Sequence, residues 1–160
     1  MNTEIKNRID TINQKINELN ALYHTAAIKS GISDGEISIW SLLLCSQDEY
    51  SQQDLADILY LPKQTVNSII SNFVKKKFVF LEHVPGTRNR KVVRLTKEGR
   101  EYGESRVMWI FQAEEKAMEE TDPEEINAYI SMLGKYIGRL KEEIEKNNGR
   151  IEKRNCRFNE

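Results

Sequence analysis

The sequence predicts a mainly α-helical protein with one small β-hairpin near its centre. Over most of the chain, apolar residues recur every three or four positions, which is the spacing of an amphipathic helix. Between residues 78 and 95 this spacing gives way to two strand-like runs on either side of Pro85-Gly86, a pattern typical of a hairpin. The chain has 160 residues, 39% of them apolar, so it is long enough to bury a core.

Both ends of the chain carry a seven-residue apolar repeat, over residues 1–30 and 121–147. A helix with such a seam becomes stable by packing against another helix. We therefore expect two dimerisation helices in a homodimer; the alternative is that both seams pack within one chain. Residues 148–160 lose the pattern and are expected to form a disordered tail. The seam positions are Ile5, Ile9, Ile12, Ile16, Leu19, Tyr23 and Ala26, and then Ile126, Ile130, Leu133, Ile137, Leu140 and Ile144.

The central segment, residues 33–100, predicts three helices followed by the hairpin. Residues 33–36 have the composition of a capping box, and Ser51 begins a short helix that ends before Leu61-Pro62. A further helix is expected over 62–77 and the hairpin over 78–95. A long connecting helix, with Thr96 as its N-cap, is then expected over 96–120. The order of helix, short turn, helix and hairpin is that of a winged helix-turn-helix.

Charge is concentrated in the same segment. Between Pro62 and Arg100, ten basic residues face two acidic ones, a local charge of +8; because the whole chain carries −1, the remainder carries −9. A basic centre within an acidic frame is typical of a surface that meets a polyanion. The simpler alternative is a solvated charged surface.

The expected reading helix, residues 62–77, contains no acidic residue in a chain with 25 Asp and Glu. Its small polar face can enter a major groove and reach base edges. A basic hairpin tip, the wing, can lie along phosphates or enter the minor groove. Ordinary solvated faces are the alternative in both places. The candidate DNA contacts are Lys63, Gln64, Thr65, Asn67 and Ser68 on the helix, and Arg88, Arg90 and Lys91 on the wing.

Two stretches of the sequence resemble the MarR family of bacterial transcription regulators. The first is Ser51-Gln52-Gln53-Asp54-Leu55-Ala56 with the helix that follows it, from Thr65-Val66 to Lys75-Lys76-Lys77. The second is Leu95-Thr96-Lys97-Glu98-Gly99-Arg100. The resemblance implies a dimer joined by its terminal helices, which binds a palindromic DNA operator. Such regulators commonly repress genes and release DNA when a small, often aromatic, molecule or an oxidant acts.

Two positions depart from the family pattern. The family's wing commonly carries Asp-x-Arg before its second strand, whereas Thr87 and Asn89 stand here, with arginines at Arg88 and Arg90. The aspartate that would hold the wing arginine is therefore missing from the wing. Many members also have an arginine where this chain has Ser68, which favours readout by shape or by amide contacts with adenine.

Other residues suggest further, weaker possibilities. Tyr23, Trp40 and Phe111 are candidates for an effector cavity, with core packing as the alternative. Cys45, after three leucines, is expected to be a buried, inert thiol; Cys156 lies beside arginines in the tail. His24 and His83 lack the spacing of metal ligands.

No pattern predicts catalysis. The sequence has no nucleophile elbow, no phosphate-binding glycine loop and no zinc-protease motif, so we expect neither an enzyme nor a cofactor or metal. It has no signal peptide and no stretch that could span a membrane, which indicates a cytoplasmic protein. The alternative to a DNA-binding regulator is a winged-helix module that binds proteins and not DNA.

Overall fold

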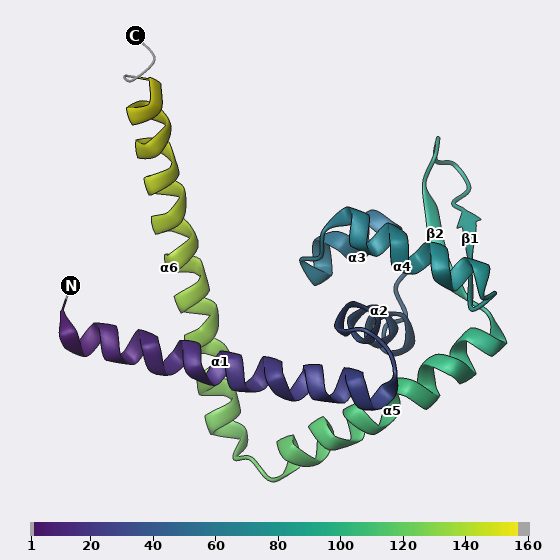
Figure 1. Ribbon diagram of the computed structural model, residues 1–160, viewed down its shortest axis with the longest axis horizontal. Helices are drawn as coiled ribbons and strands as arrows, with labels where there is room; N and C mark the ends of the chain where they lie inside the picture. Colours follow the sequence, from purple (N-terminus) through teal and green to yellow (C-terminus); the bar gives the residue numbers. More distant parts are fainter. Residues whose placement is uncertain (1, 157–160) are drawn as a thin grey trace. The chain divides into compact units, whose positions relative to one another are not determined.

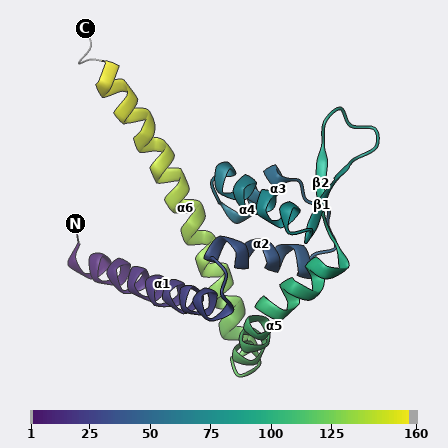
Figure 2. The ribbon, with the colours of Figure 1, turned by 45° about the vertical axis from the view of Figure 1, so that its right-hand side comes forward.

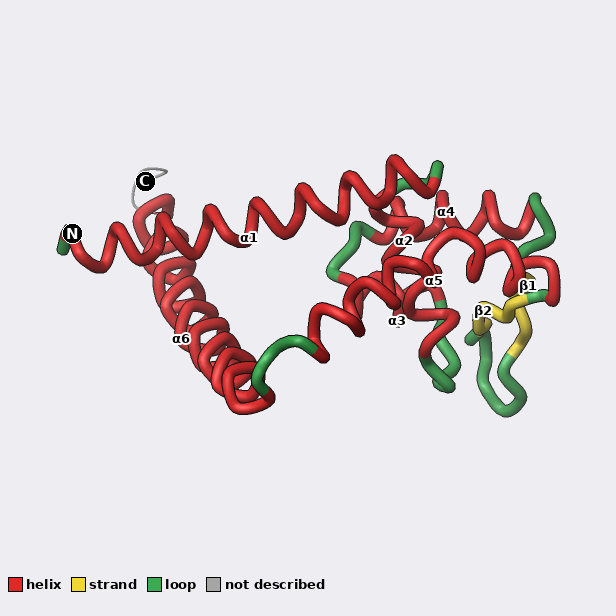
Figure 3. The backbone as a smooth tube through the Cα atoms, turned by 90° about the horizontal axis from the view of Figure 1, so that it is seen from below, coloured by secondary structure: helices red, strands yellow, loops and turns green. Residues whose placement is uncertain are grey.

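A computed structural model describes the backbone of residues 2–156 and the side chains of residues 2–147. These residues form six helices and one antiparallel hairpin, so the predicted fold class is confirmed (Figures 1 and 3). The elements are α1 (Thr3–Ser30), α2 (Asp34–Cys45), α3 (Gln52–Leu59), α4 (Lys63–Lys75), β1 (Val79–His83), β2 (Lys91–Leu95), α5 (Lys97–Glu119) and α6 (Pro123–Cys156). The chain divides within α5 into two compact units, residues 1–113 and 114–160.

An aromatic cluster forms the centre of the core of the first unit. Trp40 of α2 is fully buried and stacks on Phe73 of α4, with 4.4 Å between ring centroids. Phe78 and Tyr102 complete the cluster and stack on each other at 4.2 Å. Figure 2 shows α2 against α3 and α4. This cluster therefore holds α4, the expected reading helix, on the rest of the unit.

The predicted helix starts are present as hydrogen-bonded caps. Ser33 and Glu36 form the expected capping box at α2. Ser51 and Asp54 form a second box at α3. Both boxes satisfy backbone N–H groups that the first turn of a helix leaves without partners.

The wing is a five-residue ladder closed by a tight turn. β1 and β2 pair from Val79 opposite Leu95 to His83 opposite Lys91. The Thr87 N–H donates to the Val84 carbonyl, and Gly86 has φ of +78°. Proline and then a left-handed glycine at the central positions are typical of a type II turn. Figure 1 shows the hairpin extending beyond α4.

The close packing of α5 against the start of the hairpin explains why position 99, in the motif at residues 95–100, is a glycine. Thr96 caps α5 by accepting from the Gly99 N–H at 2.9 Å, as predicted. A Cβ at position 99 would lie 1.8 Å from the Phe78 carbonyl oxygen. Only glycine lets the first turn of α5 approach the start of the hairpin this closely.

α1 and α6 each leave much of their apolar seam exposed in the single chain. On α1, Ile5 is 53% and Leu19 48% exposed; on α6, Ile130 is 60% and Ile137 56% exposed. Asp122 caps α6 through the Glu124 N–H at 2.7 Å. No helix in the described part of the chain combines the length and apolar character needed to cross a bilayer.

The end of the last helix differs from the sequence prediction. We expected the helix to stop at residue 147, whereas α6 continues to Cys156. Ile151 follows Ile144 by seven positions, so the apolar spacing extends into the polar segment that was expected to lose it. The last four residues of the predicted tail lie outside the described residues.

Candidate nucleic-acid interface

α4 exposes the whole of its predicted reading face. Its apolar side chains Val66, Ile70 and Phe73 are buried, at no more than 1% exposure. The spacing of these three residues turns the opposite face to solvent. All five candidate contacts lie there and are exposed: Lys63, Gln64, Thr65, Asn67 and Ser68.

The charge on this face is available to a partner. α4 contains no acidic residue. Among the described residues, no ion pair involves Lys63 or Lys75. An approaching polyanion would therefore meet cations that no carboxylate of the described chain has neutralised.

Arg90 on the wing is held by a carboxylate from another element. Its Nη2 donates to Asp54 Oδ2 at 3.0 Å. The Ser51 N–H and hydroxyl donate to the same oxygen, both at 2.8 Å. These hydrogen bonds, and then the charge of Arg90, hold the pKa of Asp54 below its ordinary value. The second capping box therefore supplies the aspartate that the wing lacks.

Arg94 is more tightly held at the base of the wing. Its Nε donates to Glu82 on β1 at 2.6 Å, and its Nη2 pairs with Glu49, in the connection between α2 and α3. These two carboxylates raise the pKa of the guanidinium group. Arg94 is one of the ten basic residues counted between Pro62 and Arg100. Its charge, however, is paired with two carboxylates and helps to attach the wing.

The two remaining wing candidates, Arg88 and Lys91, are exposed and form no ion pair within the described residues. All eight predicted contacts therefore lie on two exposed surfaces of one unit, α4 and the hairpin tip.

Sequence reasoning missed three residues that shape this surface. The sequence pattern indicated Asp54 only at the start of a helix and gave no indication that it also binds Arg90. Glu49 pairs with Arg94 across 45 positions, a contact that no local spacing could indicate. Tyr60, in the turn before α4, is 94% exposed with φ of +52°. A left-handed, exposed tyrosine is uncommon, but a sequence does not reveal a φ angle.

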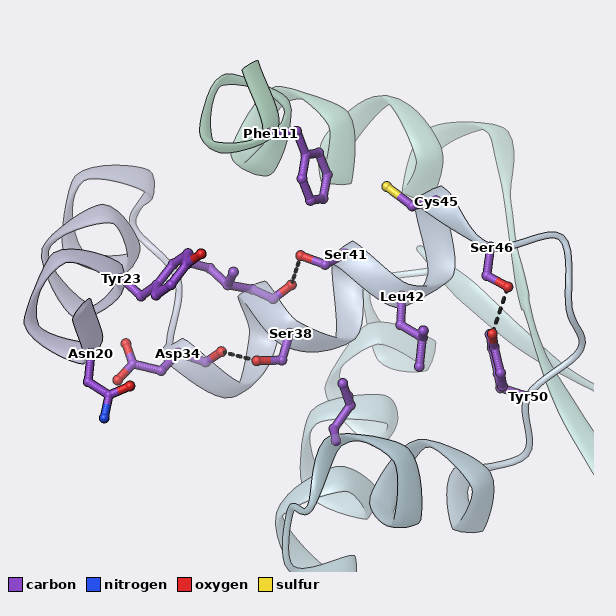
Figure 4. A pocket seen from close by; sticks show the side chains of 12 residues that line it. Asn20, Tyr23, Asp34, Ser38, Ser41, Leu42, Cys45, Ser46, Tyr50 and Phe111 are labelled. Atoms are coloured by element: carbon purple, nitrogen blue, oxygen red, sulfur yellow. Dashed lines mark hydrogen bonds between the residues drawn. The ribbon is translucent and has the colours of Figure 1, made fainter. Parts of the chain in front are cut away.

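An open pocket of about 840 Å³ lies in the same unit, between α1, α2 and α5 (Figure 4). Tyr23 and Phe111, two of the three predicted effector contacts, line it. The third, Trp40, does not, because it is buried in the aromatic cluster beneath α4. The remaining wall is mixed, and includes Asn20, Ile37, Ser38, Ser41, Leu42, Cys45 and Tyr50.

Cys45 corrects a second expectation. We predicted a buried thiol after three leucines, but the side chain is exposed and lines the pocket. Ser38 and Ser41, seven and four positions earlier, lie on the same helical face, and this polar spacing was the better signal. The side chain of Cys156 lies outside the described residues.

The two histidines occupy separate places. His24 Nδ1 lies 3.1 Å from both oxygens of Asp34, at the edge of the pocket. His83 is exposed at the end of β1. In the described residues no group of histidine, cysteine and acidic side chains could hold a metal ion.

No protein-family model and no curated protein matches the sequence. Solved structures do match it. NMB1585, a MarR family regulator from Neisseria meningitidis, has a TM-score of 0.76 at 14% identity, over 88% of this chain and 98% of that one. A MarR/EmrR family transcriptional regulator from Acinetobacter sp. ADP1 has 0.67 at 24% identity, over 86% and 96%. The MepR–DNA complex of Staphylococcus aureus has 0.66 at 21% identity, over 81% and 94%.

The chain is therefore a winged helix-turn-helix protein. Its fold is that of MarR family regulators, over nearly the full length of the matching structures. The resemblance first drawn from residues 51–100 is thus confirmed at the level of the fold.

Proposed function

We propose that this protein is a MarR-type transcription regulator that binds double-stranded DNA sequence-specifically as a homodimer in the cytoplasm. The observation that carries the proposal is the exposed, acid-free face of α4 beside a basic wing. α4 enters the major groove and presents Asn67 and its neighbours to base edges. The wing residues Arg88, Arg90 and Lys91 lie on the backbone or in the minor groove. The MepR–DNA complex, a structure of the same fold, supports this role.

The exposed apolar seams of α1 and α6 support the homodimer. Side chains such as Ile16 and Leu140 are more than 40% exposed, an arrangement that a second copy would relieve. Two-fold symmetry would set two reading helices about 34–36 Å apart, which fits a palindromic operator. The expected solution mass is twice the 18.7 kDa of one chain, measurable by light scattering.

An effector is part of the proposal. The pocket combines apolar walls, among them Ile37, Leu42 and Phe111, with the polar Asn20 and Tyr50. This composition suits a small aromatic molecule that carries a polar group. We propose that such a molecule releases a repressor from DNA.

The test is fluorescence anisotropy on a duplex from the gene's own upstream region, beside a scrambled duplex, at several salt concentrations. We expect tight, salt-sensitive binding that prefers the upstream duplex, at two chains per site. Absence of binding to either duplex at low salt would contradict the proposal and favour the alternative, a winged-helix module that binds proteins.

A further inference from the structure

The segment between α2 and α3, residues 46–50, contacts the pocket through side chains. Ser46 and Tyr50 line the pocket. The Tyr50 hydroxyl donates to Ser46 Oγ at 2.6 Å, drawn in Figure 4, and lies 3.3 Å from Asp48 Oδ2. The Tyr50 side chain is only 9% exposed, so it is packed as part of the pocket wall.

The same segment contacts the wing through other groups. The Val93 N–H donates to the Tyr50 carbonyl at 2.8 Å, and Glu49 pairs with Arg94. Val93 and Arg94 are adjacent on β2, and Lys91, a predicted DNA contact, begins that strand. Residues 49 and 50 therefore both bond to β2, Tyr50 through its backbone and Glu49 through its side chain.

We propose that residues 46–50 couple the pocket to the wing. Tyr50 faces the pocket with its ring and the wing with its carbonyl oxygen. A packed aromatic ring moves little without its backbone, so an occupant that displaces the ring also shifts this carbonyl and weakens its bond to Val93. The position of Lys91 and the wing tip then changes. The consequence for DNA rests on the proposed function, but the coupling itself does not.

Cys45 provides the means to test this, because it is exposed and lines the pocket. In a Cys156→Ser background, benzylmaleimide places a bulky group at Cys45 alone. The readout is amide hydrogen exchange of Val93, without DNA, measured by NMR. We expect alkylation to speed this exchange about fivefold, the factor that corresponds to losing one hydrogen bond. The amide of Val107, in the buried part of α5, reports global opening and should not change.

Two variants decide whether Tyr50 transmits the effect. Tyr50→Leu shortens a pocket side chain within residues 46–50. Leu59→Ala removes bulk from a pocket residue outside residues 46–50. The response of Val93 to alkylation should fall in Tyr50→Leu and persist in Leu59→Ala. Cys45→Trp introduces the bulk without chemistry and should reproduce the effect of the adduct.

The coupling is wrong if stoichiometric alkylation leaves Val93 exchange unchanged, or if Val107 accelerates equally. It is also wrong if Tyr50→Leu retains the full response. Anisotropy on the upstream duplex, run on the same samples, tests the proposed function separately. A protein that binds no DNA but shows the Val93 response would retain the coupling and lose the proposed function.

Discussion

The two surfaces that carry the predicted DNA contacts, α4 and the wing, both rest on the apolar core, but among the described residues only the wing is also tied down by ion pairs. α4 is fixed from beneath by buried apolar side chains, with Phe73 stacked on Trp40. Within the part of the chain whose side chains are described, its lysines form no ion pair. The base of the wing also buries apolar side chains, Val79 and Val93 among them, in the same core. In addition, polar contacts tie the wing to residues that precede it: Asp54 pairs with Arg90, Glu49 pairs with Arg94, and the Tyr50 carbonyl accepts from the Val93 N–H.

The difference has a physical consequence. Apolar packing leaves the charge of α4 available to a polyanion, whereas part of the positive charge of the wing is paired with carboxylates that help to hold the wing. Exposed ion pairs contribute little stability and weaken in salt, so the wing should move more readily than α4. We therefore expect substitutions beneath α4 to affect folding, and substitutions at the wing links to affect mainly binding.

The largest expected effect comes from Phe73→Ala. Removal of a ring that is 1% exposed, from the centre of the aromatic cluster, should lower the free energy of unfolding by about 3–5 kcal/mol. Urea unfolding followed by circular dichroism measures this loss. Val74→Ala, at the adjacent and 40% exposed position, is the matched control and should cost far less. Equal losses would show that α4 is not fixed by the cluster.

Asn67→Ala should change specificity. If the amide reads a base edge, its loss relaxes preference at one base pair by about 1–3 kcal/mol and leaves the unfolding free energy nearly unchanged. Competition between operator variants, each altered at one base pair, measures the change. A uniform loss of affinity for every sequence would assign Asn67 to the DNA backbone.

Arg90→Ala should weaken binding to all sequences alike. A backbone contact gives no base preference, and its loss should reduce the salt dependence of the binding constant by about one charge. The slope of log affinity against log salt measures this. Arg8→Ala, an exposed arginine of α1, removes the same charge elsewhere and should leave the slope unchanged. Loss of preference at a single base pair, with an unchanged slope, would contradict a backbone role.

Asp54→Asn tests the carboxylate that joins α3 to the wing. It should cost about 1 kcal/mol at neutral pH, as for loss of a helix cap. Because hydrogen bonds from Ser51 lower the pKa of Asp54, its contribution is present above the ordinary value of 3.8 and is lost as pH falls through the lowered pKa. The stability gap between wild type and variant should therefore narrow in acid.

Urea midpoints measured from pH 7 down to pH 2 reveal this narrowing. Asp57→Asn, three positions along α3 and bonded only to Gln53 among the described residues, is the control and should show a much smaller gap at every pH. A gap for Asp54→Asn that stays constant into acid would mean that its carboxylate is not what stabilises the start of α3.

Local chemistry explains which features were predictable. The helix caps, the turn at Gly86 and the exposed face of α4 depend on residues within a few positions of one another, and each was predicted from the sequence. Asp54, the partner of Arg90, and Glu49, one of the two partners of Arg94, lie 36 and 45 positions away. Spacing along the chain carries no information on such pairs, so the attachment of the wing appeared only in the structure.

Trp40 and Cys45 show that a sequence also does not reveal which way a side chain points, even within one helix. Both lie on α2, but the helix turns Trp40 toward Phe73 and Cys45 toward the pocket. From the sequence, Trp40 was a candidate for the cavity with core packing as the alternative, and Cys45 was expected in the core. The direction of each side chain depends on which face of α2 the rest of the unit covers, and a sequence does not show this.

The smallest expected effect is that of Tyr60→Gly, in the turn between α3 and α4. Left-handed backbone disfavours a tyrosine, while glycine adopts it freely but loses more chain entropy on folding. The net gain in unfolding free energy should be about 0.5–1 kcal/mol. Tyr60→Ala keeps the unfavourable φ, removes the ring and should not stabilise. If both variants lose affinity for DNA equally, the exposed ring itself belongs to the interface. If only Tyr60→Gly loses affinity, it is the stiffness of the turn that holds α4 at the angle DNA requires.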